Sequence, residues 1–288
     1  MKLIGKILLA AIAYALGTML TGIITGALHL PMPDLPPGTT TSSLLAGMVI
    51  ATPLLIAALL PLAQGLRGTW ARRWLAIAVL LFIALGVNTI LEAVAFTTMF
   101  AKAGYWNIVH YILPSAFVAA ALTMPVRSRA GESKLMRDVG AAGWVWRLAV
   151  AWLAFPVIYF LFGMCVAPIV VPYYNAGVAG LRIPAMDIIV RTVLIRSALF
   201  LVASLPAVFL WTKSRTSLFF ALGVAHTVMV GVYGLIQATW FPPVLRVAHS
   251  IEITADSFAY AAVLVLLFTR KAKAAQPEVV RAAVAGAN

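Results

Sequence analysis

Three polar residues close together near the end of the chain are the first candidates for chemistry. His249, Glu252 and Asp256 are spaced i, i+3 and i+7, which places them on one stripe of a helix. A neutral imidazole with carboxylates can ligate a divalent metal or act as an acid–base set. With His110 they form the predicted metal site, although no established metal motif is reproduced. The alternatives are a site for a polar substrate or proton, and an ordinary acidic helix start favoured by the helix dipole.

A second set of polar residues interrupts other apolar segments. Glu92 and Arg196 are expected roughly 10 to 15 Å below one membrane surface, and buried charges of opposite sign generally pair. That pair could equally be structural, fixing one helix against another. Arg191 lies four residues from Asp187, a spacing that suits a local salt bridge. The predicted substrate-binding residues are Glu92, Arg191, Arg196, Gln237, Asn88 and Tyr233.

The segments that carry these residues are those of a membrane protein. Of the 288 residues, 63% are hydrophobic and 10% are charged, whereas about a quarter of residues are charged in soluble domains. A helix needs about 20 apolar residues to cross a bilayer. The sequence therefore predicts an all-α, polytopic membrane helical bundle with spans at 5–28, 43–65, 74–98, 107–125, 147–168, 187–211, 217–240 and 252–269.

The distribution of basic residues predicts the topology. Loops on one side of the predicted bundle hold only Lys102, Arg182 and Arg246, whereas the termini and the other loops hold most of the remaining basic residues. Because cytoplasmic loops are rich in Lys and Arg, both termini are expected in the cytoplasm, in the inner (cell) membrane of a bacterium. The net charge of +13 is thereby assigned to topology and lipid headgroups, and no nucleic acid partner is predicted.

The chain shows signs of an internal repeat. Residues 14–96 align without a gap on 159–241, and the alignment matches Leu60-Pro61 with Leu205-Pro206 and Gly86-Val87 with Gly231-Val232. Shared hydrophobic composition is the alternative explanation. Four spans per half would make the two repeats parallel. The predicted organisation is a first repeat at 1–126, a cytoplasmic linker at 127–146, a second repeat at 147–270 and a disordered tail at 271–288.

Several chemistries are excluded or disfavoured. Cys165 is the only cysteine, which excludes disulfides and CxxC redox sites. The chain has no phosphate-binding Gly-rich loop, HExxH or GxSxG motif. His226 is expected near mid-membrane, where it either bonds a neighbouring helix or relays protons; it has no well-placed histidine partner for haem. No cofactor is predicted, with a divalent metal as the open alternative.

The function that these residues favour is a transporter or permease-like protein for a small polar or anionic solute. The arginines would hold negative charge, and Glu92 could accept a coupling proton. One alternative is a membrane-embedded enzyme acting on a lipid or lipid-linked substrate at the outer leaflet. The other is a non-catalytic membrane subunit. The expected partners are the bilayer, a small polar solute or lipid, and further copies or subunits in a membrane complex.

Overall fold

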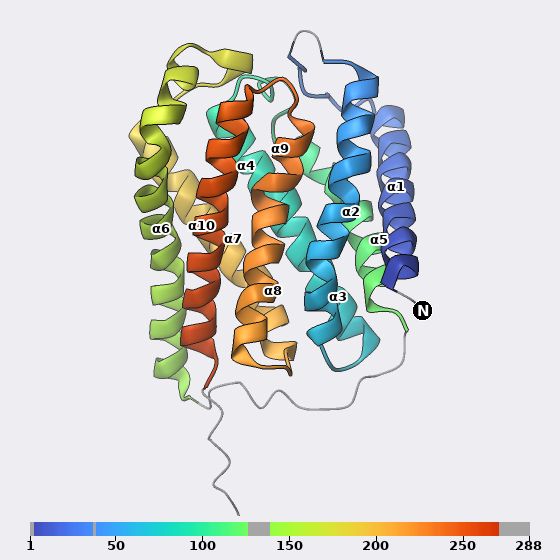
Figure 1. Ribbon diagram of the computed structural model, residues 1–288, viewed down its shortest axis with the longest axis vertical. Helices are drawn as coiled ribbons and strands as arrows, with labels where there is room; N and C mark the ends of the chain where they lie inside the picture. The colour runs from blue at the N-terminus through green and yellow to red at the C-terminus, as the bar shows by residue number, and fades with distance from the viewer. Residues whose placement is uncertain (1–2, 37–38, 126–138, 271–288) are drawn as a thin grey trace, which may run out of the picture.

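Eight helices that are long and apolar enough to cross a membrane run side by side in one bundle (Figure 1). The structure is a computed structural model that describes residues 3–36, 39–125 and 139–270. The prediction of an all-helical, eight-span bundle is confirmed: these residues contain no β-strand, and only two isolated bridge pairs. Residues 127–138 of the predicted linker and all of the predicted tail lie outside the described ranges.

Five of the spans are single α-helices, and the fourth span changes its helix type near one end. One of the five, α6 (Ala141–Asn175), is described below. The other four are α1 (Leu3–Ala27), α2 (Thr41–Gly65), α7 (Met186–Leu210) and α10 (Pro243–Phe268). The fourth span begins as the 3₁₀-helix η2 (Gly104–Tyr111) and continues as α5 (Ile112–Thr123). Pro114 lies in the first turn of α5, next to the junction with η2.

The third and seventh spans each contain a short π-helix. The third consists of α3 (Trp70–Leu81), η1 (Phe82–Val87) and α4 (Asn88–Phe96). The seventh consists of α8 (Arg215–Thr227), η4 (Val228–Val232) and α9 (Tyr233–Gln237). A π-helical segment widens the turn and often occurs next to a functional site.

The fifth span, α6 (Ala141–Asn175), is longer than the predicted 147–168. Pro168 and Pro172 each remove one backbone donor without ending the helix. It ends where Gly177 adopts a left-handed conformation (φ 64°) and donates to Tyr174, followed by the short 3₁₀-turn η3 (Val178–Gly180). The additional turns place Tyr174 inside the bundle, beside α10.

The eighth span also begins earlier than predicted. The sequence indicated a start at 252, but α10 starts at Pro243, whose fixed φ suits the first helical position. His249, Glu252 and Asp256 therefore lie in the interior of a long helix. The alternative that they form an acidic helix start is wrong.

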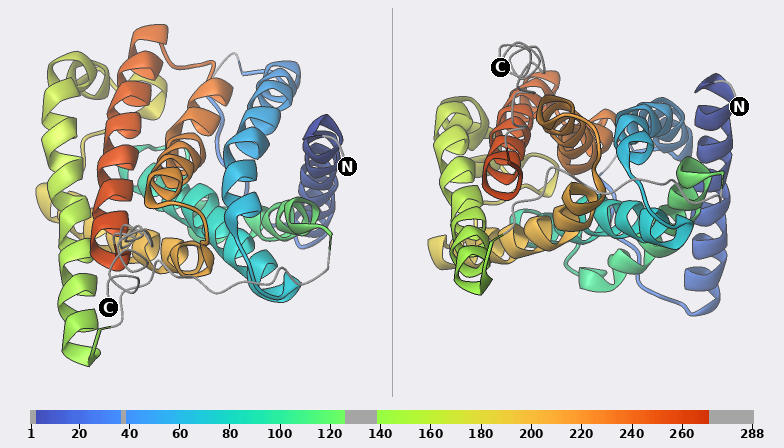
Figure 2. Two further views of the ribbon diagram at one scale, coloured as in Figure 1. Left: turned by 60° about the horizontal axis from the view of Figure 1, so that its bottom comes forward. Right: turned by 90° about the horizontal axis from the view of Figure 1, so that it is seen from below.

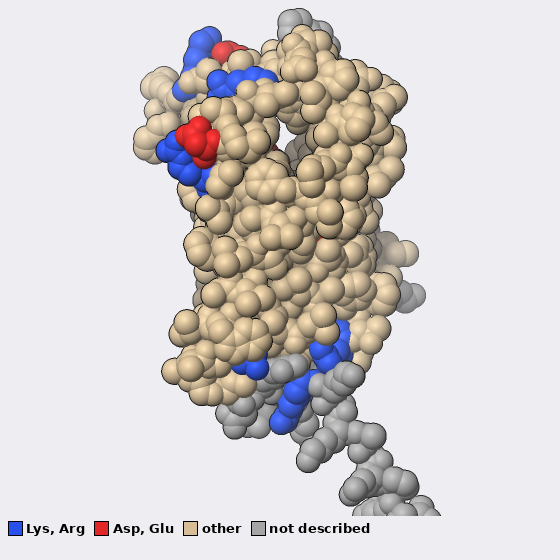
Figure 3. Space-filling view, turned by 90° about the vertical axis from the view of Figure 1, so that its left-hand side faces the viewer, with Lys and Arg blue, Asp and Glu red and all other residues tan. Residues whose placement is uncertain are grey.

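Charge is distributed unequally between the two ends of the bundle. We call the end with residues 66–69, 124–125, 211–214 and 269–270 the basic end. Of the acidic residues that the structure describes, Asp34, Glu92, Asp187 and Glu252 lie nearer the other end, and Asp256 lies at the middle of α10. The space-filling view shows charged atoms at both ends and an uncharged belt between them (Figure 3). It also shows an opening near the end opposite the basic end, where Lys or Arg and Asp or Glu atoms are both visible. This distribution is that of an integral membrane protein.

The two halves of the chain lie on opposite sides of the bundle, with α1 and α6 at opposite edges (Figure 2). Within the first half α1 packs against α5, and α5 against α3; within the second half α6 packs against α10, and α10 against α8. Between the halves, α2 packs against α8 and α9, while α7 packs against α3 and α4. A two-fold rotation that exchanged the halves would convert each contact named for one half into the contact named for the other half.

Matching contacts also join residues 145 positions apart. Leu66 forms an isolated bridge with Trp211, flanked by hydrogen bonds from Arg67 N to Leu210 O (3.0 Å) and from Thr212 N to Gly65 O (3.3 Å). The hydroxyl oxygens of Thr69 and Ser214 accept from Arg72 N and Ser217 N, and so cap α3 and α8 in the same way. The sequence alignment pairs these same positions; superposition of the complete halves remains a prediction.

Candidate functional site

A small polar cavity of about 70 Å³ lies between α4, α6, α7, α8 and α10. The helices supply charged groups from three different spans, because Glu92 is on α4, Arg196 is on α7, and His249, Glu252 and Asp256 are on α10. The remaining lining residues are mostly aromatic or apolar: Phe96, Phe155, Tyr159, Tyr174, Phe200, His226, Val230, Ile253, Ser257 and Tyr260. Residues far apart in the sequence therefore meet in one site.

The predicted pairing of Glu92 with Arg196 is confirmed. Nη1 of Arg196 lies 2.8 Å from Oε1 of Glu92, and only 3% of the arginine side chain is exposed. The guanidinium carbon lies 5.8 Å from the ring centroids of Tyr159 and Phe200, which adds cation–π attraction. Nε and Nη1 nevertheless lack a partner with hydrogen-bond geometry in the described part of the chain. The guanidinium is thus charge-compensated but keeps free donor capacity.

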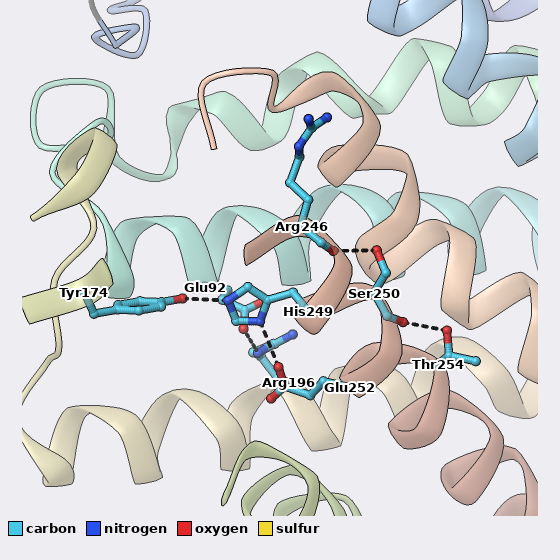
Figure 4. Close-up of polar contacts among 8 residues, drawn as sticks. All are labelled: Glu92, Tyr174, Arg196, Arg246, His249, Ser250, Glu252 and Thr254. Carbon is cyan, nitrogen blue, oxygen red and sulfur yellow. Dashed lines mark hydrogen bonds and ion pairs between the residues drawn. The ribbon is translucent and has the colours of Figure 1, made fainter. Parts of the chain in front are cut away.

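The three residues on α10 face the same cavity. Nδ1 of His249 lies 2.8 Å from Oε2 of Glu252, and Nε2 lies 3.4 Å from the hydroxyl of Tyr174 (Figure 4). Asp256 is only 7% exposed, and its Oδ1 has no hydrogen-bond partner among the residues described. Because buried polar atoms are normally hydrogen-bonded, this carboxyl group has unused capacity to bind.

The deep end of the cavity is formed by His226 and Tyr260. Nε2 of His226 lies 3.0 Å from Oγ of Ser204, so the predicted bond to a neighbouring helix is confirmed. The hydroxyl of Tyr260 is buried and has no partner in the described ranges. Both residues belong to the lining, which makes this end polar but uncharged when the imidazole is neutral.

A second, larger cavity of about 450 Å³ adjoins the first, and its size is typical of ligand pockets. Six residues line both cavities: Glu92, Phe96, Tyr174, Val230, His249 and Ile253. Its other walls are largely apolar and aromatic, including Met48, Met99, Phe100, Tyr111, Trp240 and Phe241. Glu92 and His249 therefore lie at the boundary between the small charged cavity and the larger, mostly apolar cavity.

The predicted site residues fall in four places. Glu92, Arg196, His249, Glu252 and Asp256 share the small cavity, so the predicted substrate and metal sets are brought together. Gln237, Tyr233 and His110 line the larger cavity. Asn88 is fully buried and lines neither of these two cavities. Arg191 is exposed and forms an ion pair with Asp187, as its spacing predicted.

Several polar residues of the larger cavity are bonded to neighbours. The hydroxyls of Tyr233 and Tyr14 lie 2.5 Å apart, and Nε2 of Gln237 donates to Tyr233 O (3.1 Å). Nε2 of His110 lies 3.2 Å from Oγ1 of Thr25. Oγ1 of Thr89, Nδ1 of His110 and Nε1 of Trp240, which also belong to this lining, have no hydrogen-bond partner among the described residues.

The four predicted metal ligands do not all line the same cavity. In the described ranges, no group of three or more His, Cys, Asp or Glu side chains is arranged to hold a metal ion. His110 is bonded to Thr25 and lines only the larger cavity of the two, while His249 is bonded to Glu252. The chemistry that the small cavity offers is recognition by charge, together with an imidazole–carboxylate pair that can exchange a proton.

The residues that the sequence did not identify are aromatic. Tyr159, Tyr174 and Tyr260 supply hydroxyls or ring faces to the cavity. In the sequence, each of these residues is only a hydroxyl-bearing side chain within an apolar segment, a feature that many structural tyrosines share.

The chain has no significant match among protein-family models, curated proteins or solved structures. Its class therefore rests on the fold and the site, which define a polytopic helical membrane protein with a buried charged cavity.

Proposed function

We propose that this protein is a permease-like carrier that binds a small polar solute in the two adjoining cavities. The observation that supports it most is the convergence of Glu92, Arg196 and the three polar residues of α10 on one cavity. Ionisable groups within membrane spans are costly and generally mark solute or ion pathways. A subunit that needed polar residues only to join helices would not require a cavity beside them.

The proposed orientation places the basic end in the cytoplasm. Described basic residues at that end include Lys6, Arg67, Arg72, Arg73, Arg147, Lys213, Arg215 and Arg270. The positive-inside rule then puts the cavities in the outer half of a cell membrane, accessible from the side away from the cytoplasm. A bacterial inner membrane with cytoplasmic termini is the setting that fits.

Alternating access would come from movement of one half of the chain against the other. The π-helices η1 and η4 contact each other between the halves, and a π-helix is a point where a span can change its pitch. The Leu66–Trp211 bridge and its flanking hydrogen bonds hold the halves together at the basic end. Rocking of the halves about the cavities would therefore separate this bridge when the carrier opens toward the basic end, and restore it when the carrier opens toward the other end.

Two-sided thiol accessibility tests this proposal. Gly234 lines the larger cavity, and a Cβ added there would meet no atom within 4 Å. In a Cys165→Ser background, Gly234→Cys is labelled with a membrane-impermeant thiol reagent in right-side-out and in inside-out vesicles. A carrier gives labelling from both sides.

The other outcomes identify the alternative functions. Labelling from the outside alone favours an enzyme working at the outer leaflet, and absence of labelling from either side favours a structural subunit. Leu16→Cys, on the exposed surface of α1, serves as a control for reagent entering the lipid phase.

A further inference from the structure

We propose that the solute is an organic cation, with a protonated amine or quaternary ammonium group in the small cavity and an apolar body in the larger one. This inference rests on the proposed carrier function and specifies its substrate class. It differs from the sequence-based expectation, which favoured a polar or anionic solute held by two arginines.

The charges of the small cavity favour a cation. Its lining carries three carboxyl groups, one guanidinium and the imidazoles of His226 and His249. That guanidinium, on Arg196, already contacts Glu92 at 2.8 Å. Arg191 is on the protein surface beside Asp187, and Arg246 points away from the cluster (Figure 4). An anion entering this cavity would therefore meet more carboxyl groups than guanidinium groups.

The atoms without partners make an independent argument for a ligand. Oδ1 of Asp256 and the hydroxyl of Tyr260 have no hydrogen-bond partner within the described residues, and the two side chains are 93% or more buried. They are four residues apart on α10, so they face the cavity one above the other. A donor such as an alkylammonium would satisfy both oxygens; a quaternary group would compensate the charge of Asp256.

The walls suit such a ligand as well. Aromatic faces attract cations, and Phe96, Phe155, Tyr174 and Tyr260 belong to the lining of the small cavity. The larger cavity offers the apolar surface of Met48, Phe100 and Trp240, among others. Since Glu92 and His249 line both cavities, a cation with an apolar substituent can occupy the two at once.

Equilibrium binding of radiolabelled benzyltrimethylammonium to the full chain in lipid nanodiscs tests the proposal, with benzenesulfonate as the matched anionic probe. We expect saturable binding of the cation and none of the anion. Asp256→Asn and Glu252→Gln should each weaken cation binding about tenfold or more, because each removes a charge-assisted contact. Asp34→Asn is the control, because Asp34 is exposed and contacts Lys102 at 3.1 Å.

Replacing Arg196 distinguishes a cationic solute from an anionic one. Arg196→Gln removes the cavity's positive group, so it should strengthen binding of the cation, whereas it would abolish binding of an anion. If this variant fails to fold, the double variant Glu92→Gln with Arg196→Gln removes both charges of the pair. The double variant should keep cation binding, since Glu252 and Asp256 remain.

Each contrary result has a distinct meaning. Binding of benzenesulfonate that is lost in Arg196→Gln would overturn the cation assignment while leaving a solute pocket in place. Cation binding that is unchanged in Asp256→Asn and Glu252→Gln would place the probe elsewhere and also overturn the assignment. If neither probe binds and the thiol assay shows no two-sided access, both the cation and the carrier are wrong.

Discussion

Glu92 and Arg196 form one ion pair with two different environments: the arginine side chain is 3% exposed, whereas the glutamate side chain is 34% exposed. The guanidinium depends on its partner for charge compensation, but the carboxylate also reaches the wall of the larger cavity. Because the Glu92 carboxylate both neutralises Arg196 and lines the larger cavity, a solute that binds there can change the strength of the ion pair. The pair is thus placed to respond to what enters the cavity.

This difference in exposure predicts unequal effects of the two single substitutions on stability. Glu92→Gln leaves a buried, uncompensated guanidinium and should lower the free energy of unfolding by about 3 kcal/mol. Arg196→Met leaves a carboxylate that water can reach, so its loss should be clearly smaller. Thermal unfolding in mild detergent measures both. The order would be reversed if Glu92 were the more buried partner.

The contact between the halves at the basic end predicts a packing effect. A Cβ on Gly65 would lie 1.9 Å from Cζ3 of Trp211, which is itself buried, so the ring or the backbone must move. Gly65→Ala should destabilise the protein by roughly 1 to 3 kcal/mol. Gly22→Ala is the matched control, since a Cβ there meets nothing within 4 Å. Equal unfolding temperatures for the two variants would show that the bridge region is not tightly packed.

Arg191 provides a test of which arginine belongs to the site. It forms an ion pair with Asp187, and both side chains are more than half exposed. Exposed pairs contribute little, so Arg191→Gln should change the free energy of unfolding by less than about 0.5 kcal/mol and leave probe binding unaltered. Arg191→Gln is measured side by side with Arg196→Gln as the comparison. A loss of probe binding in Arg191→Gln would show that Arg191 takes part in the site.

Metal analysis checks the chemistry of the α10 residues. Because His249 is bonded to Glu252 and the described residues form no three-ligand group, we expect no stoichiometric zinc, manganese or iron in the purified protein. The measurement compares wild type with His249→Ala and Glu252→Ala by mass spectrometry. Stoichiometric metal that disappears in both variants would instead support a membrane-embedded enzyme.

The spans and the ion pair could be predicted from the sequence because their determinants are local or few. Apolar length alone defines a membrane helix, and two deep charges of opposite sign leave little choice of partner. The start of α10 was missed because His249, Glu252 and Asp256 lower the hydropathy of its first half. Those charges are tolerated because they face a cavity and not lipid.

The composition of the site could not be predicted, because it depends on which helices are neighbours. Asn88 shares a helical face with Glu92 but lies one turn deeper, where it is fully buried and lines neither of the two cavities. The metal and substrate sets looked separate in the sequence, yet α4, α7 and α10 bring them into one site. Tyr174 belongs to that site only because α6 continues beyond its apolar stretch.

Uptake of radiolabelled benzyltrimethylammonium into proteoliposomes is the most direct test of a carrier with an acidic solute site. We expect saturable uptake above that of protein-free liposomes, strongly reduced in Asp256→Asn and unchanged in Asp34→Asn. Uptake equal to that of protein-free liposomes, by folded protein that binds the probe, would contradict the assignment as a carrier.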